Sequence, residues 1–160
     1  MTTANTETVT TFQSMNLPKS LNDAIIRLGY SEPTEIQALS LPPARQGRDV
    51  LGTAATGSGK TVAFLEEVAL ELTKNTHLRV TSIFGGVGQN PQAAALRGGT
   101  EIVIATPGRL LDHLGQGNAK FGGVEVLVLD EADRMLDMGF VRDIRRIVAT
   151  LPHARQTLLF

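Results

Sequence analysis

Two clusters of residues in this chain have the types and spacing needed to bind a nucleoside triphosphate. The first is a glycine-rich run, Ala54-Ala55-Thr56-Gly57-Ser58-Gly59-Lys60-Thr61. Its glycines can adopt positive φ and bring backbone N–H groups close to phosphate oxygens, and a helix that starts near Lys60 would direct its positive end at them. Lys60 adds a cation, and the Thr61 hydroxyl is placed to ligate a Mg²⁺ ion that bridges the phosphates. A plain glycine-rich turn is disfavoured, because a strand-like Val50-Leu51 precedes the run and a stretch of helical period follows it.

The second cluster, Asp130-Glu131-Ala132-Asp133, follows a short apolar segment over Val124 to Leu129. That segment is typical of a strand buried on both faces of a parallel sheet, whose carboxyl end is where open α/β sheets bind ligands. We expect Asp130 to hold the magnesium, partly through water, and Glu131 to orient or deprotonate the attacking water. The catalytic candidates are therefore Lys60 and Glu131. An acidic helix start is the alternative, which the neighbouring phosphate loop disfavours.

With these residues the chain resembles the DEAD-box family of ATP-dependent RNA helicases, and the segment from Val124 to Phe140 is close to the family pattern. The segment from Gly29 to Gln37 is similar to the family's Q motif. The resemblance implies that Phe12 stacks on adenine, that Tyr30 and Thr34 lie at the nucleotide, and that Gln37 reads the adenine edge, for which its amide has a donor and an acceptor. Thr34 and Gln37 also form a capping box, which would start a helix without any ligand.

Two further segments resemble family motifs that contact RNA. Thr106-Pro107-Gly108-Arg109 follows a strand-like run and is similar to the motif that grips the sugar-phosphate backbone. A helix N-terminus with proline at its first position and an arginine nearby suits phosphate binding, although an ordinary strand-to-helix turn would look the same. The doublet Gly85-Gly86 resembles a second RNA-contacting element, and two glycines after a strand are also a common turn.

The chain departs from the family pattern in two places. After Leu65 the helix that follows the phosphate loop runs straight into the segment from Glu66 to Lys74. One helix thus takes the place of a helix, a strand and a second helix in the family pattern. Losing an interior strand would leave unpaired ladder groups or force the neighbouring strands together. The chain also stops at Phe160, before the family's next motif and its second RecA-like domain, so we expect little turnover from this piece.

The elements that must position these residues alternate in type, which predicts a mainly parallel α/β sheet with helices on both faces, a RecA-like P-loop domain with one family strand missing. Expected strands lie near 50, 80–84, 102–105, 124–129 and 157–160. Expected helices include one capped by Ser20, one that closes at Pro42-Pro43, and one from about Asp133 to Thr150. We expect a disordered tail over residues 1–11 and a partial ATP-binding domain over 12–160.

Composition fits one domain of 160 residues with 42% apolar content and no cysteine. We expect a cytoplasmic monomer that does not enter a membrane. The net charge of −1 gives no global signature of nucleic-acid binding. The arginines at 142, 145 and 146 are interpreted as a solvated helix face, and His77, His113 and His153 as surface or packing residues.

Three functional hypotheses follow. The first is the N-terminal RecA-like domain of a DEAD-box RNA helicase, which binds Mg-ATP or its product ADP and, weakly, single-stranded RNA. The second is a non-catalytic remnant that binds an adenine nucleotide or a protein partner. The third is a small nucleotide kinase with the same loop, which is disfavoured because the Asp130-Glu131 motif and the Gln37 element have no counterpart there.

Overall fold

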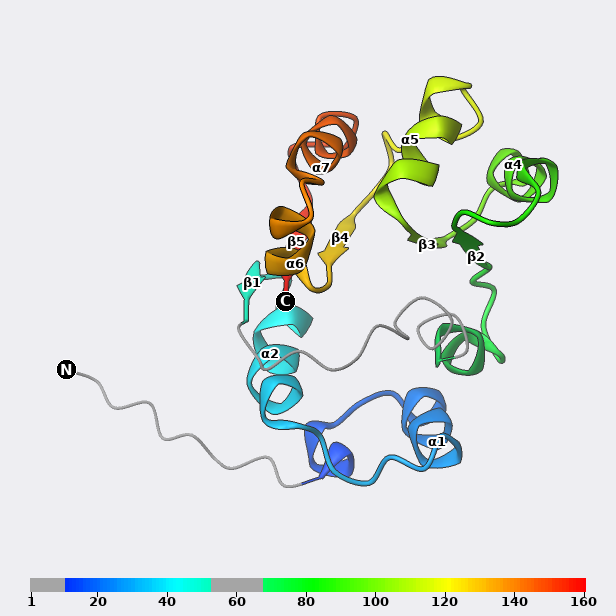
Figure 1. Ribbon diagram of the computed structural model, residues 1–160. Coiled ribbons are helices and arrows are strands. Elements are labelled where there is room, and N and C mark those ends of the chain that lie inside the picture. Colours follow the sequence, from blue (N-terminus) through cyan, green and yellow to red (C-terminus); the bar gives the residue numbers. More distant parts are fainter. Residues whose placement is uncertain (1–10, 53–67) are drawn as a thin grey trace.

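The computed structural model describes residues 11–52 and 68–160, in which helices and parallel strands alternate (Figure 1). The strands are β1 (Val50–Leu51), β2 (Val80–Ile83), β3 (Ile102–Ala105), β4 (Val126–Leu129) and β5 (Gln156–Leu159). The helices are the 3₁₀ helix η1 (Phe12–Met15) and the α-helices α1 (Lys19–Arg27), α2 (Glu35–Arg45), α4 (Gln89–Gly98), α5 (Pro107–Gly115), α6 (Ala132–Asp137) and α7 (Val141–Val148). Residues 68–73 are also helical. Each of the five expected strands is confirmed to within two residues at either end.

The strands form two separate sheets. One has the order β1-β5-β4, with Leu159 opposite both Leu51 and Leu129. The other pairs β2 with β3 in a register that sets Ile83 opposite Ala105. Every pairing among the described residues is parallel, so the carboxyl ends of the strands in each sheet meet at one edge.

The two sheets stay separate within the part of the chain that the structure describes. Among the described residues β4 pairs with β5 and β3 pairs with β2, and no ladder joins β4 to β3. Of the two outcomes expected for a lost interior strand, closure of the gap by the neighbouring strands is not seen within residues 11–52 and 68–160.

One face of β4 is uncovered, which corrects the expectation of a strand buried on both faces. Val126 and Val128 are 48% and 52% exposed, while Leu127 and Leu129 are half-buried. Side chains alternate along a strand, so the two valines share a face. Helical packing connects the two sheets instead, because α5 packs against α7.

Helix α2 lies along the three-stranded sheet with its N-terminus at the carboxyl ends of the strands. The Gln156 side chain, at the start of β5, donates to the carbonyl oxygens of Ala44 and Arg48 at 2.8 Å each. At the other end of the helix, a Cβ built on Gly52 would lie 2.6 Å from Ile36 Cδ1 and 3.1 Å from Phe160 Cδ1, so a larger residue would displace the Ile36 side chain. The beginning of α2 is thereby held beside the end of β1.

The predicted start of one helix and the predicted end of another are each wrong by a few residues. Helix α1 begins at Lys19 with Pro18 at the N-cap, so Ser20 lies in the first turn and does not cap it. Helix α2 continues through Pro42 and Pro43, because proline removes N–H donors without preventing the last turn from forming. Its end is instead held by the Gln156 bonds.

The predicted helix over residues 133–150 is two helices. Gly139 has φ +84°, in the left-handed region that ends a helix, and it lies between α6 and α7. The chain therefore turns after α6, and α7 is free to pack on α5. None of the helices within the described ranges has the length and apolar character needed to cross a membrane.

Candidate functional site

The carboxyl ends of β1, β5 and β4 bring together chain segments from three parts of the sequence. The Gly52 N–H donates to Leu159 O at 2.9 Å, and the Phe160 N–H donates to Leu129 O at the same distance. Gly52, at the entrance to residues 53–67, and Asp130 therefore flank the end of β5. With neighbouring strands about 4.8 Å apart, the two lie about 10 Å from each other.

The acidic pair at the end of β4 has a constrained backbone. Glu131 has φ +52°, a left-handed conformation that is rare for a residue other than glycine. Its N–H donates to Asp130 Oδ1 at 3.1 Å, and the Ala132 N–H donates to Phe160 O at 2.8 Å. These contacts hold Asp130 and Glu131 at the edge of the sheet.

Arg134 binds the Glu131 carboxylate, with Nη1 donating to Oε2 at 2.8 Å. The Glu131 side chain is 21% exposed and the Arg134 side chain 48%, so the pair reaches solvent. The three-residue spacing on a helix could have predicted this contact, which our sequence analysis missed. The guanidinium both neutralises Glu131 and fixes the direction of its carboxylate.

The residues present suit magnesium. Asp130 supplies hard carboxylate oxygen and is half-buried. No group of three or more acidic, histidine or cysteine side chains among the described residues could hold a metal alone. A single carboxylate agrees with the usual binding of Mg²⁺, which keeps several waters and uses substrate phosphates as ligands.

The start of α2 confirms the capping interpretation of Thr34 and Gln37. The Thr34 N–H donates to Gln37 Oε1 at 2.9 Å, and both side chains are exposed. The amide oxygen of Gln37 keeps a second lone pair and its NH₂ group keeps two donors. The cap therefore leaves this side chain able to pair with a base edge.

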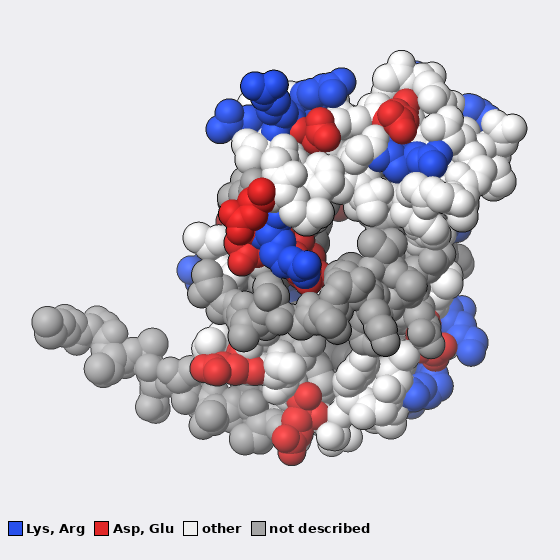
Figure 2. Space-filling view, viewed as in Figure 1, with Lys and Arg blue, Asp and Glu red and all other residues white. Residues whose placement is uncertain are grey.

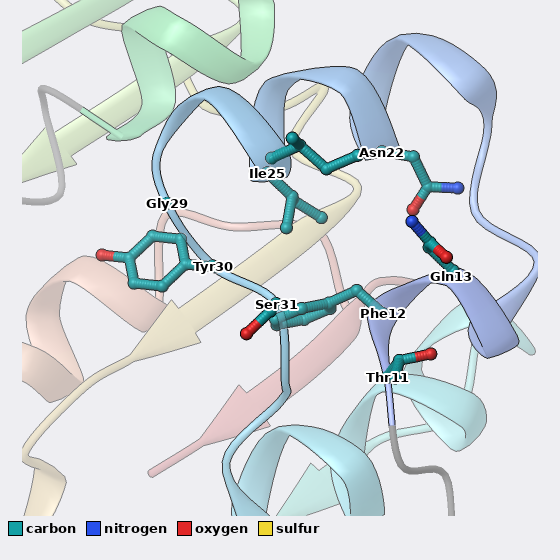
Figure 3. Close-up of a pocket in the computed structure, with 9 residues that line it drawn as sticks. Thr11, Phe12, Gln13, Asn22, Ile25, Gly29, Tyr30 and Ser31 are labelled. Atoms are coloured by element: carbon teal, nitrogen blue, oxygen red, sulfur yellow. The ribbon is translucent and has the colours of Figure 1, made fainter.

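Phe12 and Tyr30 lie together in a pocket of about 400 Å³ between η1, α1 and the segment that follows α1 (Figure 3). Phe12 is 8% exposed and its N–H donates to Ser31 O at 3.4 Å, whereas Tyr30 is 40% exposed. Thr34 and Gln37 are not among the residues that line this pocket. The structure thus divides the four adenine-site candidates into two pairs.

The second sheet brings the two predicted RNA-contacting segments to one edge. Gly85 and Gly86 follow β2, and Gly86 has φ +83°. Thr106 is the N-cap of α5 with Pro107 at its first position, as predicted, and the Thr106 N–H donates to Ile83 O at 2.9 Å. Gly108 and Arg109 complete the first turn, where helical N–H groups have no partner within the helix.

The predicted phosphate loop lies outside the described residues. The loop comprises Ala54, Ala55, Thr56, Gly57, Ser58, Gly59, Lys60 and Thr61. The catalytic role predicted for Lys60 and the magnesium-binding role predicted for Thr61 therefore stay predictions. Residues 1–10 of the expected tail also fall outside. Gly52 shows only that the chain enters this segment at the edge that carries Asp130.

Helix α7 carries its three arginines on an exposed face, which agrees with the interpretation of a solvated helix face. Arg142, Arg145 and Arg146 are exposed, and Figure 2 shows basic side chains gathered over this helix. Arg146 lies 3.9 Å from Asp143, one turn earlier. The opposite side of the helix buries Ile147.

Comparison with known proteins agrees with this geometry. The family model for DEAD/DEAH box helicases matches residues 34–74 and 65–160. This chain belongs to that family. It is 41% identical to the ATP-dependent RNA helicase SrmB of Escherichia coli over 96% of this chain and 42% of SrmB. It is 42% identical to DEAD-box ATP-dependent RNA helicase 30 of Arabidopsis thaliana, over 93% of this chain and 31% of that protein.

The DEAD-box relatives are longer than this chain in two ways. The chain spans less than half the length of the relatives that it matches. The alignment with SrmB also has 186 positions, more than the 160 residues present here, and the family model matches in two parts that meet at residues 65–74. This agrees with the predicted internal loss after Leu65.

Proposed function

We propose that this chain is a partial ATP-binding domain of a DEAD-box RNA helicase, which binds Mg-ATP or Mg-ADP at the edge of β1, β5 and β4. The observation that supports it best is the shared edge, where Gly52, the acidic pair and the start of α2 converge. RNA binds weakly at the other sheet, over Gly85-Gly86 and the N-terminus of α5. We further propose that the chain is a cytoplasmic monomer.

Each side chain at the nucleotide edge has one role in this proposal. Asp130 holds magnesium, partly through water, with Thr61 as the second protein ligand. Lys60 binds the terminal phosphates, and Glu131 orients the attacking water. Gln37 reads the adenine edge, and Phe12 stacks on the ring after turning out of its pocket. Magnesium, when bound, neutralises phosphate charge that develops during transfer.

Turnover by this chain is expected to be low. The relatives extend well beyond it, and an arginine supplied from outside the nucleotide site can raise the rate of phosphoryl transfer by about a thousandfold or more. In addition, Arg134 holds Glu131 in an ion pair. Nucleotide binding without efficient hydrolysis is the property that the geometry supports best.

Phosphate release separates binding from catalysis. We expect slow release from Mg-ATP by the parent chain, no release by Glu131→Gln, and equal ADP affinity for both, because the amide keeps the size of the carboxylate and removes its charge. Calorimetric titration with Mg-ADP supplies the affinity. Release that is the same in the variant and the parent would show that Glu131 has no catalytic role.

One observation favours a second candidate, a non-catalytic adenine-nucleotide-binding or partner-binding remnant. The proposed nucleotide edge and the proposed RNA edge belong to different sheets, joined among the described residues by packing of α5 on α7 rather than by a ladder. Coupling between the two ligands should then be weak. If RNA changes neither ADP affinity nor phosphate release, while ADP still binds, the remnant is the better description.

A further inference from the structure

A line of hydrogen bonds runs from the exposed Arg97 in α4, through the buried His113 and Gln92, to the end of β2. His113 is fully buried, and its Nε2 lies 3.1 Å from Gln92 Oε1. Its Nδ1 lies 3.3 Å from Asn118 Nδ2, and Arg97 Nη1 donates to Asn118 Oδ1 at 2.6 Å. At the other end Gln92, which is 6% exposed, donates from Nε2 to Phe84 O at 3.0 Å.

The two ends of this line determine the direction of every bond between them. The guanidinium of Arg97 can only donate, so the oxygen of Asn118 faces it and the NH₂ of Asn118 donates to His113 Nδ1. The Phe84 carbonyl can only accept, so Gln92 directs its NH₂ there and its oxygen toward His113. His113 must then be neutral with its proton on Nε2. The donors therefore point in one direction, from Arg97 to Phe84.

The last acceptor is part of a peptide group that matters for RNA binding. The carbonyl of Phe84 and the N–H of Gly85 belong to one planar unit and point in opposite directions. The Gln92 bond to Phe84 O therefore also sets the direction of the Gly85 N–H. Within residues 11–52 and 68–160 that N–H has no acceptor, and Gly85 is exposed.

The same peptide unit lies beside the N-terminus of α5. The Ile83 carbonyl, one residue before Phe84, accepts from the Thr106 N–H at 2.9 Å. Glycine has no side chain to restrain φ and ψ, so without an external contact the Phe84–Gly85 unit could rotate freely. Gln92 supplies that contact from inside the protein, on the side away from solvent.

We propose that Gln92 and His113 are positioning residues for RNA: they hold the Gly85 N–H toward the surface so that it and the first turn of α5 donate together to the phosphate backbone. This inference rests on the proposed RNA site. Neither residue touches RNA, since both are buried. Their role is to fix one donor before the ligand arrives, which lowers the entropic cost of binding.

The test measures binding of a labelled single-stranded oligouridine by fluorescence anisotropy, well below the melting temperature of every variant. Gln92→Met keeps the size of the side chain and removes both hydrogen bonds. We expect it to weaken RNA binding about fivefold to tenfold, while Mg-ADP affinity stays unchanged. Gln89→Ala is the matched control, because Gln89 also connects α4 to the end of α5, through Gln116 at 3.3 Å, but does not reach Phe84.

Arg109→Ala separates failure of the inference from failure of the RNA site. If the parent binds RNA and Arg109→Ala weakens it, but Gln92→Met binds as the parent does, the positioning role is wrong and the RNA site stands. If the parent does not bind, or Arg109→Ala binds equally well, both are wrong. A merely structural Gln92 would lower the melting temperature without changing RNA affinity.

Nitrogen NMR of the parent tests the bond directions without any variant. We expect His113 to be the neutral Nε2–H tautomer, and the Gly85 amide to exchange rapidly with solvent. The Nδ1–H tautomer is incompatible with the bonds from Asn118 to His113 and from Gln92 to Phe84 O, so finding it would overturn the inference, even if Gln92→Met fails to fold.

Discussion

Glu131 combines a catalytic assignment with an unfavourable backbone conformation. A left-handed conformation costs a residue with a Cβ about 1–2 kcal/mol relative to the right-handed one, and contacts on both sides hold it there. Such conformations are retained where the surrounding structure requires a particular side-chain direction. Here the turn places Asp130 and Glu131 together at the edge of the sheet.

This strain predicts an unusual order of stability at position 131. Glu131→Gly should be more stable than Glu131→Ala by about 1 kcal/mol, although glycine is normally the less stable of the two. Both variants lose the contact with Arg134, so that loss cancels in the comparison. Urea denaturation of the two proteins measures the difference. Equal stability, or a more stable alanine variant, would show that the backbone is not strained.

A second residue-scale prediction separates the two roles of Gln37. In Gln37→Glu a carboxylate oxygen can still accept from the Thr34 N–H, but the donors for an adenine edge are gone. We expect an unchanged melting temperature without ligand and a loss of the preference for ADP over GDP, measured by calorimetry. Gln37→Ala is the comparison, because it should lose both the cap and the preference. Retained preference in Gln37→Glu would leave Gln37 with capping alone.

At the scale of elements, Arg79 connects the start of β2 to the start of β3. Its side chain donates to both carboxylate oxygens of Glu101, at 2.9 and 3.1 Å, and to Gly98 O at 3.0 Å. The Arg79 N–H also donates to Glu101. Hydrogen bonds from Arg79 thereby lower the pKa of Glu101 from 4.5 to about 2. The pair stabilises the register of the two-stranded sheet.

The lowered pKa of Glu101 predicts that the stability of the fold falls over a defined range of acid pH. A carboxylate with a lowered pKa in the folded state stabilises the fold above its unfolded pKa, and that contribution is lost as the pH falls from about 4.5 to about 2. In Arg79→Met the stem remains and the bonds are absent, so the pKa of Glu101 should return toward its usual value. Side-chain NMR titration measures it. A normal pKa for Glu101 in the parent would contradict the assigned contacts.

The elements that could be predicted from sequence are those with a local cause. The strands were located because short β-branched runs end at motifs, and the start of α5 because Thr106 and Pro107 favour it. The turn at Gly139 was missed, because a helical pattern continues on both sides of a glycine that only tertiary packing places in the left-handed region. The Gln92–His113 bond joins residues far apart in sequence and leaves no local pattern.

The residues of the candidate site also divide into those that sequence could place and those that depend on tertiary packing. The acidic pair and the α5 N-terminus lie where parallel-sheet topology predicts, at carboxyl edges. By contrast, the separation of Phe12 and Tyr30 from Thr34 and Gln37 depends on how η1 packs on α1, which sequence spacing does not encode. The left-handed Glu131 also had no signal, since the residue type disfavours that conformation.

At the scale of the whole molecule, β4 is an edge strand among the residues that the structure describes. In a parallel ladder alternate N–H groups point to opposite neighbours, so Leu127 and Leu129 donate toward β5 while Val126 and Val128 point to the open side. We expect hydrogen exchange to be fast for the two valine amides and slow for the two leucine amides. Protection of all four amides would mean that a strand covers this edge.

The central claim is that the edge of β1, β5 and β4 binds an adenine nucleotide, and a thermal melt with and without Mg-ADP tests it most directly. Ligand at a hundred times its dissociation constant should add about 2.7 kcal/mol of stability. We predict a cooperative transition that moves to higher temperature with Mg-ADP in the parent and does not move in Lys60→Ala. An equal shift in Lys60→Ala, or no shift in a cooperatively folded parent, would contradict the proposed nucleotide site.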